Sequence, residues 1–434
     1  MISEKILSPF QKFVNIESFS GILLMLTTIL ALVWANSPLS DSYQALWQYK
    51  IGFKTQDFEL YKPLILWVND GLMAIFFFLI GLEIKREFLI GELNSVKKLA
   101  FPLVGALGGM FVPVGLFILL NQNPDTFRGW GIPMATDIAF SLAVLKLLGD
   151  KVPLSLKVFL TAFAIVDDLG AVLVIALFYS GTIKLGLLIT ALILLAILYV
   201  FSYKGYYSRF VMIVFGIIIW TLFLKADIHP TLAGVLLAFS VPIGQKVKTP
   251  EFVENLEVIT NNIKMASVLK KPILSAEQIN EIDNLEEWSS KYQSPLQRLE
   301  HNLHNWVAYF IIPIFALANA GISINSNIHL DMALAINITV GLVIGKSLGI
   351  SAIIFLSKKL KFIDIPFDIS SRQIIGVSFL GGIGFTMSIF IASLAFVENP
   401  LYLDSAKIGI LIGSLLSAIC GYFILNTKSV RQES

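Results

Sequence analysis

The stretch AIVDDLGAVLVI (residues 164–175) places two adjacent aspartates, Asp167 and Asp168, in an otherwise apolar run. If this run crosses a membrane, each ionised carboxylate near the bilayer centre costs roughly 2.5–3.5 kcal/mol on insertion scales. Ionisable residues at such depth usually mark an ion or proton pathway. We therefore ask whether the chain crosses a membrane, and what the two carboxylates would bind there.

The composition of the whole chain indicates a membrane protein. Of its 434 residues, 56% are hydrophobic and 14% are charged, and the mean hydropathy is +0.78. Soluble domains carry about a quarter charged residues. The net charge of +2 without a basic cluster gives no indication of nucleic acid as a partner, and the single cysteine excludes an internal disulfide. We predict an all-α polytopic protein in the lipid bilayer.

Twelve apolar runs approach the ~20 residues that a spanning helix needs. They are too long for barrel strands and do not alternate, so helices are expected. Lys and Arg gather in the loops on one side of these spans, which predicts that both termini are cytoplasmic. The expected spans are 17–36, 60–84, 99–121, 128–149, 155–179, 182–202, 208–224, 227–244, 303–322, 332–357, 373–397 and 404–426.

Three segments lie outside these spans, in what we expect to be one transmembrane domain covering residues 1–434. Residues 1–16 alternate apolar and charged positions, as expected of an amphipathic helix on the membrane surface. The extracytoplasmic segment 37–59 leads into QYKIGFKTQDFEL (48–60), whose alternation predicts a small β-hairpin. The long cytoplasmic loop 245–302 begins with an amphipathic helical stretch, for which a solvated connector is the simplest interpretation.

Four ionisable residues lie well inside predicted spans: Asp137, Asp167, Asp168 and Lys346. Three acids against one base leave at least one carboxylate without an internal cation, and a buried carboxylate of that kind is protonated or binds a cation. Adjacent helical residues point about 100° apart, so one of the paired aspartates can contact Lys346 while the other faces a hydrated cavity. Two negative charges so close resist joint ionisation, which favours exchange of protons for a small hard cation with oxygen ligands such as Thr136.

Two of the spans, the fourth and the eleventh, contain interruptions. GIPMATDIAF (131–140) carries Pro133, and FLGGIGFTMS (379–388) carries three glycines. Interruptions at corresponding positions of two three-span groups fit an inverted repeat and indicate a transport site. If the two broken helices cross, Asp137 and Lys346 are suited to neutralise the partial charges of the half-helix ends.

Seven stretches, in order along the chain, resemble the NhaA-type bacterial sodium/proton antiporters. Inverted repeats are already known in this family, so the resemblance and the repeat are not independent. The stretches are WVNDGLMAIFFFLIGLEIKRE (67–87), ATDIAF (135–140), AIVDDLGA (164–171), HPTLAG (229–234), RLEHNLHNWVAY (298–309), GKSLGI (345–350) and GIGFTMSIFIASLAF (382–396).

The resemblance implies electrogenic, pH-regulated exchange of cytoplasmic Na⁺ or Li⁺ for external H⁺ by alternating access. It implies a bacterial inner-membrane protein without a cofactor, and a homodimer formed through the 48–60 hairpin. Within the site, Asp168 corresponds to the aspartate that binds the cation, and Asp167 to a neighbour that shares in binding and pairs with the lysine matched by Lys346. Asp137 and Thr136 correspond to the dipole-compensating aspartate and a nearby threonine.

The resemblance also assigns residues near both membrane surfaces. Asp70 corresponds to an aspartate on the periplasmic side, and Ser347 and Asn305 depart from prolines that are usual in the family. For the two histidines of the motif at 298–309, simple placement at a helix end remains an alternative to regulation. The residues assigned to pH sensing or to a cytoplasmic funnel are Glu83, Glu87, His229, Glu300, His301 and His304.

Two other functions were weighed against antiport. An intramembrane aspartyl protease needs two carboxylates from facing helices, whereas Asp167 and Asp168 are neighbours on one, and no GxGD element surrounds them. A cation channel would conduct independently of the proton gradient. The sequence carries no phosphate-binding glycine loop for coupling to ATP. We therefore expect a secondary transporter and not an enzyme.

Overall fold

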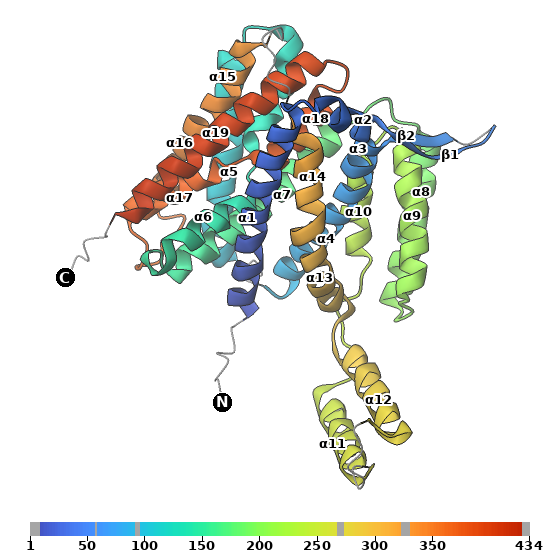
Figure 1. The fold of residues 1–434 in the computed structure, drawn as a ribbon. Coiled ribbons are helices and arrows are strands. Elements are labelled where there is room, and N and C mark those ends of the chain that lie inside the picture. Colours follow the sequence, from blue (N-terminus) through green and yellow to red (C-terminus); the bar gives the residue numbers. More distant parts are fainter. Residues whose placement is uncertain (1–8, 57–58, 92–95, 267–272, 323–329, 428–434) are drawn as a thin grey trace.

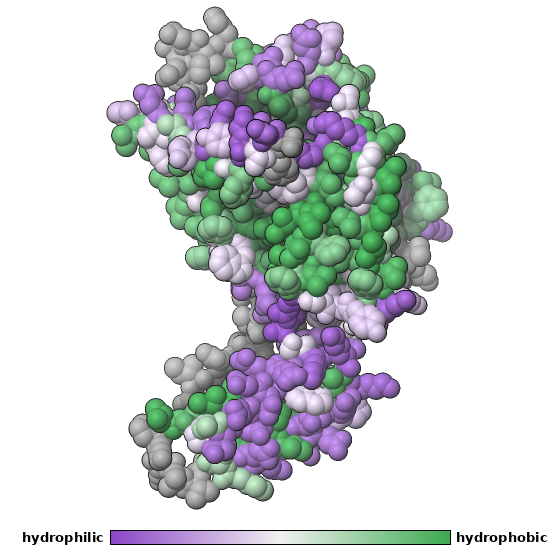
Figure 2. All heavy atoms as spheres, turned by 90° about the vertical axis from the view of Figure 1, so that its right-hand side faces the viewer, coloured by the Kyte–Doolittle hydropathy of each residue, from purple (hydrophilic) through white to green (hydrophobic). Residues whose placement is uncertain are grey.

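The computed structural model describes residues 9–56, 59–91, 96–266, 273–322 and 330–427. Its helices form a bundle with the two-stranded sheet at one end and a pair of helices, α11 and α12, projecting from the other (Figure 1). Seen from the side of α8 and α9, a broad hydrophobic surface separates a hydrophilic top from a hydrophilic lower lobe (Figure 2). Such a belt between polar ends is what a bilayer requires.

The elements of the first half run from α1 to α10. They are α1 (Pro9–Ala35), α2 (Ser40–Gln48), β1 (Lys50–Lys54), β2 (Glu59–Pro63), α3 (Leu64–Leu66), the π-helix η1 (Trp67–Leu72), α4 (Met73–Leu89), α5 (Val96–Leu120), the 3₁₀-helix η3 (Pro124–Met134), α6 (Ile138–Leu148), the 3₁₀-turn η4 (Gly149–Lys151), α7 (Leu154–Phe178), α8 (Leu185–Tyr203), α9 (Arg209–Lys225) and α10 (Pro230–Phe239).

The second half starts with the projecting helices and returns to the bundle. Its elements are α11 (Thr249–Ala266), α12 (Ala276–Tyr292), α13 (Pro295–Trp306), the π-helix η5 (Val307–Ile311), α14 (Ile312–Asn319), α15 (Met332–Val340), the π-helix η6 (Gly341–Gly345), α16 (Lys346–Lys359), α17 (Ser371–Gly381), α18 (Phe385–Ala395) and α19 (Pro400–Asn426).

Length and composition support fewer spans than the sequence predicts. In the described part of the chain, six helices are long and apolar enough to cross a membrane, or up to nine if each bent pair counts as one span. Two of the other expected spans are short, since α9 has 17 residues and α10 has 10. A multi-pass helical membrane protein is therefore supported, and the number twelve stays a prediction.

The two predicted interruptions are present. Helices η3 and α6 are bent by 45° about residues 135–137, and α17 and α18 by 41° about residues 382–384. Ala135 and Asp137 have extended backbone angles, so no intrahelical hydrogen bond crosses the first break. Freed backbone groups at membrane depth must find other partners, and here the two breaks supply them to each other.

Two glycines let α5 and α16 approach closely. A Cβ atom at Gly108 would lie 2.2 Å from the carbonyl oxygen of Gly349, and a Cβ at Gly349 would lie 2.2 Å from that of Gly108. Any side chain at either position would push the helices apart. Gly349 lies about one turn after Lys346 on α16, so this close approach of the two helices is next to the buried lysine.

The predicted hairpin is confirmed as an antiparallel pair in which Lys50 lies opposite Pro63 and Lys54 opposite Glu59. The segment 37–59 also contains α2, which is not among the elements predicted from the sequence. Trp67 donates a hydrogen bond to the carbonyl of Ile51 at 3.0 Å, which ties the hairpin to the start of η1.

The other two segments outside the spans differ in detail from expectation. Residues 1–8 of the expected surface helix 1–16 lie outside the described residues, and the remainder belongs to α1, which continues into the first span without a break. The loop 245–302 contains α11, where a helix was expected, and a second helix, α12, packed against it. Both project away from the bundle (Figure 1).

Candidate functional site

The two broken helices meet at their interruptions. The backbone N–H of Asp137 donates to the carbonyl of Ile383 at 2.6 Å, and the Thr136 hydroxyl donates to the carbonyl of Gly381 at 2.8 Å. Gly381 is the last residue of α17, so Thr136 satisfies a carbonyl left open by the helix end. The sequence predicted the two breaks, and the structure shows that they are in direct contact.

Asp137 lies between two helix N-termini. Its side chain caps α6 by accepting from the N–H of Phe140 at 3.1 Å. It also accepts from the N–H of Thr386 at 3.1 Å and from the Thr386 hydroxyl at 2.5 Å, in the first turn of α18. A carboxylate in this place balances the positive ends of both half-helices.

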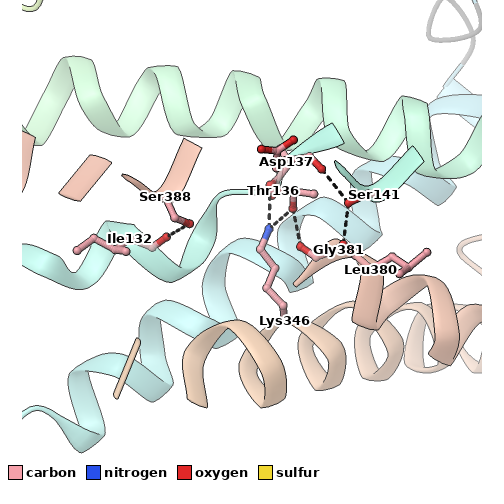
Figure 3. A network of polar contacts seen from close by, with 9 residues as sticks. Ile132, Thr136, Asp137, Ser141, Lys346, Leu380, Gly381 and Ser388 are labelled. Atoms are coloured by element: carbon pink, nitrogen blue, oxygen red, sulfur yellow. Dashed lines mark hydrogen bonds and ion pairs between the residues drawn. The ribbon is translucent and has the colours of Figure 1, made fainter. Parts of the chain in front are cut away.

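Two serines hold the crossing together, and neither was identified from the sequence. The Ser141 hydroxyl lies within hydrogen-bonding distance of the carbonyls of Asp137 (2.8 Å) and Leu380 (2.9 Å), and it has one proton for the two. Ser388 donates to the carbonyl of Ile132 at 2.8 Å (Figure 3). The only sequence signal was the presence of small hydroxyl residues in the interrupted spans.

Lys346 reaches into this crossing from α16. Its side chain has no exposed surface, and its Nζ donates to Asp167 Oδ2 at 2.8 Å. It also donates to the Thr136 hydroxyl at 2.7 Å (Figure 3). The ammonium also lies 5.5 Å from the centre of the Phe163 ring, one turn before Asp167 on α7. The buried lysine therefore joins α7, α16 and the first break through one group.

Asp168 follows Asp167 on α7 and retains 6% of its surface, while Asp167 retains none. Its carboxylate is close enough to Lys346 for an electrostatic interaction. In the described part of the chain, no group of three or more His, Cys, Asp or Glu side chains could hold a metal ion. The two adjacent carboxylates, with hydroxyl and backbone oxygens nearby, suit a small hard cation that is carried as a substrate.

A family model described as Na⁺/H⁺ antiporter 1 matches residues 11–425. The chain belongs to this antiporter family. The match covers both broken spans and all the buried charges described above, and it agrees with the resemblance seen in the sequence motifs.

Individual antiporters are similar over almost the whole length of the chain. The Na⁺/H⁺ antiporter NhaA of Oleidesulfovibrio alaskensis is 45% identical over 97% of this chain and 94% of its own. An antiporter named NhaA 1 from Saccharophagus degradans is 44% identical over 97% and 92%. The NhaA of Helicobacter pylori strain 26695 is 46% identical over 96% and 94%.

The function predicted from the sequence is thereby confirmed: the chain is a Na⁺/H⁺ antiporter, a membrane transporter rather than an enzyme. Buried Asp137, Asp167 and Asp168 are consistent with its cation site. The protease and channel alternatives are not supported by these relationships.

The antiporter brings most of the predicted funnel residues together around Arg86 on α4. The guanidinium pairs with Glu87 at 2.7 Å and with Glu300 at 2.9 Å. His304 Nδ1 lies 3.9 Å from a carboxylate oxygen of Glu83. Burial raises the pKa of Glu300, although the neighbouring Arg86 opposes the shift. Arg86 itself was missed as a site residue, although it lies within the quoted motif at 67–87.

We call Arg86 and these four side chains the Arg86 cluster. Two other residues assigned to pH control, His301 and His229, have different surroundings. His301 is exposed. His229 lies at the hairpin end of the antiporter, where its ring nitrogen is hydrogen-bonded to the carbonyl of Tyr179. Asp70 is at the same end, paired with Lys62 of β2 at 3.2 Å. The residues assigned to pH control are thus divided between the two ends of the bundle.

Proposed function

We propose that Asp168 is the carboxylate at which Na⁺ or Li⁺ and protons compete, and that Asp167 shares in binding. The observation that carries this is the wholly buried Lys346–Asp167 pair directly beside Asp168. The ammonium of Lys346 pairs with Asp167, which is wholly buried, whereas its neighbour Asp168 retains 6% of its surface. Thr136, hydrogen-bonded to the same ammonium, is placed to add an oxygen ligand.

In this mechanism the site crosses the membrane either with the cation or with protons. Cation binding displaces protons from this carboxylate site, and cation release lets the site be protonated again. Because the exchange is electrogenic, more protons than Na⁺ ions cross in each cycle, and the proton gradient expels Na⁺ without ATP. Asp137 and Lys346 compensate the half-helix charges during the change of access, in which the two broken helices shift.

We further propose twelve spans in a bacterial inner membrane, with residues 1–434 forming one domain and both termini cytoplasmic. The described chain begins toward the end of the bundle that carries α11 and α12, and α19 runs from the opposite end down one side of the bundle (Figure 1). The excess of Lys and Arg in the loops supports the orientation. The Arg86 cluster is then cytoplasmic, where Glu83, Glu87, Glu300, His301 and His304 form the entrance that senses pH.

Everted membrane vesicles test the exchange directly. With a proton gradient established, addition of Na⁺ or Li⁺ should release protons in a saturable, pH-dependent manner, and choline should not. The measurement is dequenching of a pH-sensitive fluorophore across a pH series. Na⁺ flux that persists unchanged after the proton gradient is collapsed would instead indicate a channel.

The hairpin is the element through which we propose a homodimer. Two strands alone are marginal in water, and the free edge of β1 (Lys50–Lys54) is open to pairing with a second copy across a two-fold axis. The residues of the exchange site all come from one chain, so dimerisation is not needed to complete it.

Deletion of residues 48–58 should therefore yield monomers that still exchange Na⁺ for protons, with lower stability. Calibrated size-exclusion in detergent and proteoliposome transport measure the two properties. The matched control is Lys50→Gln, which leaves the backbone edge intact and should remain dimeric. A dimer that survives the deletion places the interface elsewhere, and inactive monomers would show that the site is not self-contained.

A further inference from the structure

A small cavity lies where the projecting helices join the bundle. None of the exchange-site residues lines it. Its volume is about 150 Å³. It lies between the start of α9, the end of α12 and the start of α13. The lining residues are Tyr207, Arg209, Lys246, Ser290, Lys291, Gln293, Pro295 and Arg298.

The charge of this cavity is one-sided. Four of its lining side chains are cationic and none is a carboxylate. Lys291 is partly neutralised by Glu287 at 2.7 Å, one turn earlier on α12. Arg298 donates to the Ser290 hydroxyl, which holds its guanidinium against the wall. At least three positive charges, those of Arg209, Lys246 and Arg298, therefore have no acidic partner among the lining residues.

Neutral donors add to this positive field. The helices α9 and α13 begin at lining residues, Arg209 and Pro295, so two helix N-termini face the region. The end of α12 works in the opposite sense, but the N–H of Lys246 donates to the carbonyl of Lys291 at 3.1 Å and satisfies part of that end. Burial raises the pKa of Tyr207 to about 12, so its hydroxyl stays protonated, and in this structure it donates to the weak acceptor Met212 Sδ at 3.6 Å, which an anion could replace.

We propose that this cavity binds a phosphate group. Guanidinium groups, an ammonium group and a phenol hydroxyl surround the cavity, and each can donate hydrogen bonds to the oxygens of a phosphate. Cationic side chains are the most numerous kind among the lining residues. A larger groove of about 610 Å³ shares Tyr207, Lys246 and Pro295 with the cavity. The groove gives room for the rest of a soluble organic phosphate or for the chains of an anionic lipid.

The purified full-length protein in detergent provides the first test. Isothermal titration with inorganic pyrophosphate should show saturable binding, weakened at least about tenfold by Lys246→Gln with Arg298→Gln, since each substitution removes a charge-assisted contact. Lys264→Gln, on α11 and outside the cavity, is the control and should bind normally. Lys246→Gln alone, at an exposed position, should show an intermediate loss and guards against misfolding of the double variant.

A second titration distinguishes the source of the phosphate. Short-chain phosphatidylglycerol is compared with short-chain phosphatidylcholine on the same proteins. If the unmodified protein binds pyrophosphate and the double variant does not, the ligand is a soluble phosphate. If the unmodified protein binds phosphatidylglycerol selectively and the double variant does not, the ligand is a lipid head group. Absence of saturable binding by both anions, or equal binding by the double variant, overturns the proposal.

Discussion

Asp168→Asn should abolish Na⁺-dependent proton movement while the protein still folds. Asparagine has nearly the same shape but neither ionises nor takes up a proton, so both competing ligands lose their site. Asp168 retains only 6% of its surface, and the neutral amide removes a buried charge without creating a cavity. We expect exchange below detection in everted vesicles and no cation-induced proton release from the purified variant.

The control for this variant is Asp404→Asn. Asp404 is a half-buried aspartate on α19 that takes no part in the exchange site, so its neutralisation should leave transport intact. Expression, size-exclusion profile and melting temperature of both variants report folding. Normal transport by a well-expressed Asp168→Asn protein would remove Asp168 from the mechanism.

Lys346→Ala should produce the largest loss of stability of any substitution in the exchange site. The ammonium is wholly buried and lies 2.8 Å from Asp167, so its removal leaves a buried carboxylate without its cation. Breaking a buried pair by removing one partner costs on the order of 3–5 kcal/mol. We expect a lower melting temperature in detergent, with transport weakened or shifted in pH. Lys358→Ala, exposed at the end of the same helix, should have little effect.

The pairing itself is tested by a double-mutant cycle. Asp167→Asn combined with Lys346→Ala removes both charges and should recover part of the lost stability, because no unpaired ion is left in the bundle. Thermal unfolding of the four proteins gives the coupling. Strictly additive losses would mean that the two residues do not interact in the folded protein.

Several features follow from local sequence signals alone. A low charged fraction and repeated apolar runs determine a membrane protein, because a bilayer excludes polar side chains. The rough alternation of apolar and polar residues in 48–60 predicted the hairpin, and Pro133 and the glycines near Gly382 predicted the two breaks. Each of these signals is read within a few neighbouring residues, which is why the sequence suffices.

Short and polar helices were harder to predict. Helix α2 has nine residues and α12 is mostly polar, so neither forms a long apolar run of the kind that identified the spans. Helix α12 did carry a usable signal, since Ser275 and Gln278 form a capping box that marks its start. Their place in the protein depends on packing with distant partners, which periodicity does not report.

The sequence by itself determined which charges fall inside long apolar runs, and that three acids there accompany one lysine. The tertiary structure decided the partners: Lys346 contacts Asp167, 179 residues away, and Asp137 contacts Thr386, 249 residues away. Such contacts depend on the crossing of the broken helices and on the close approach of Gly108 and Gly349. The physical reason is that local signals specify helices and their ends, whereas pairing across a bundle depends on how several helices pack at once.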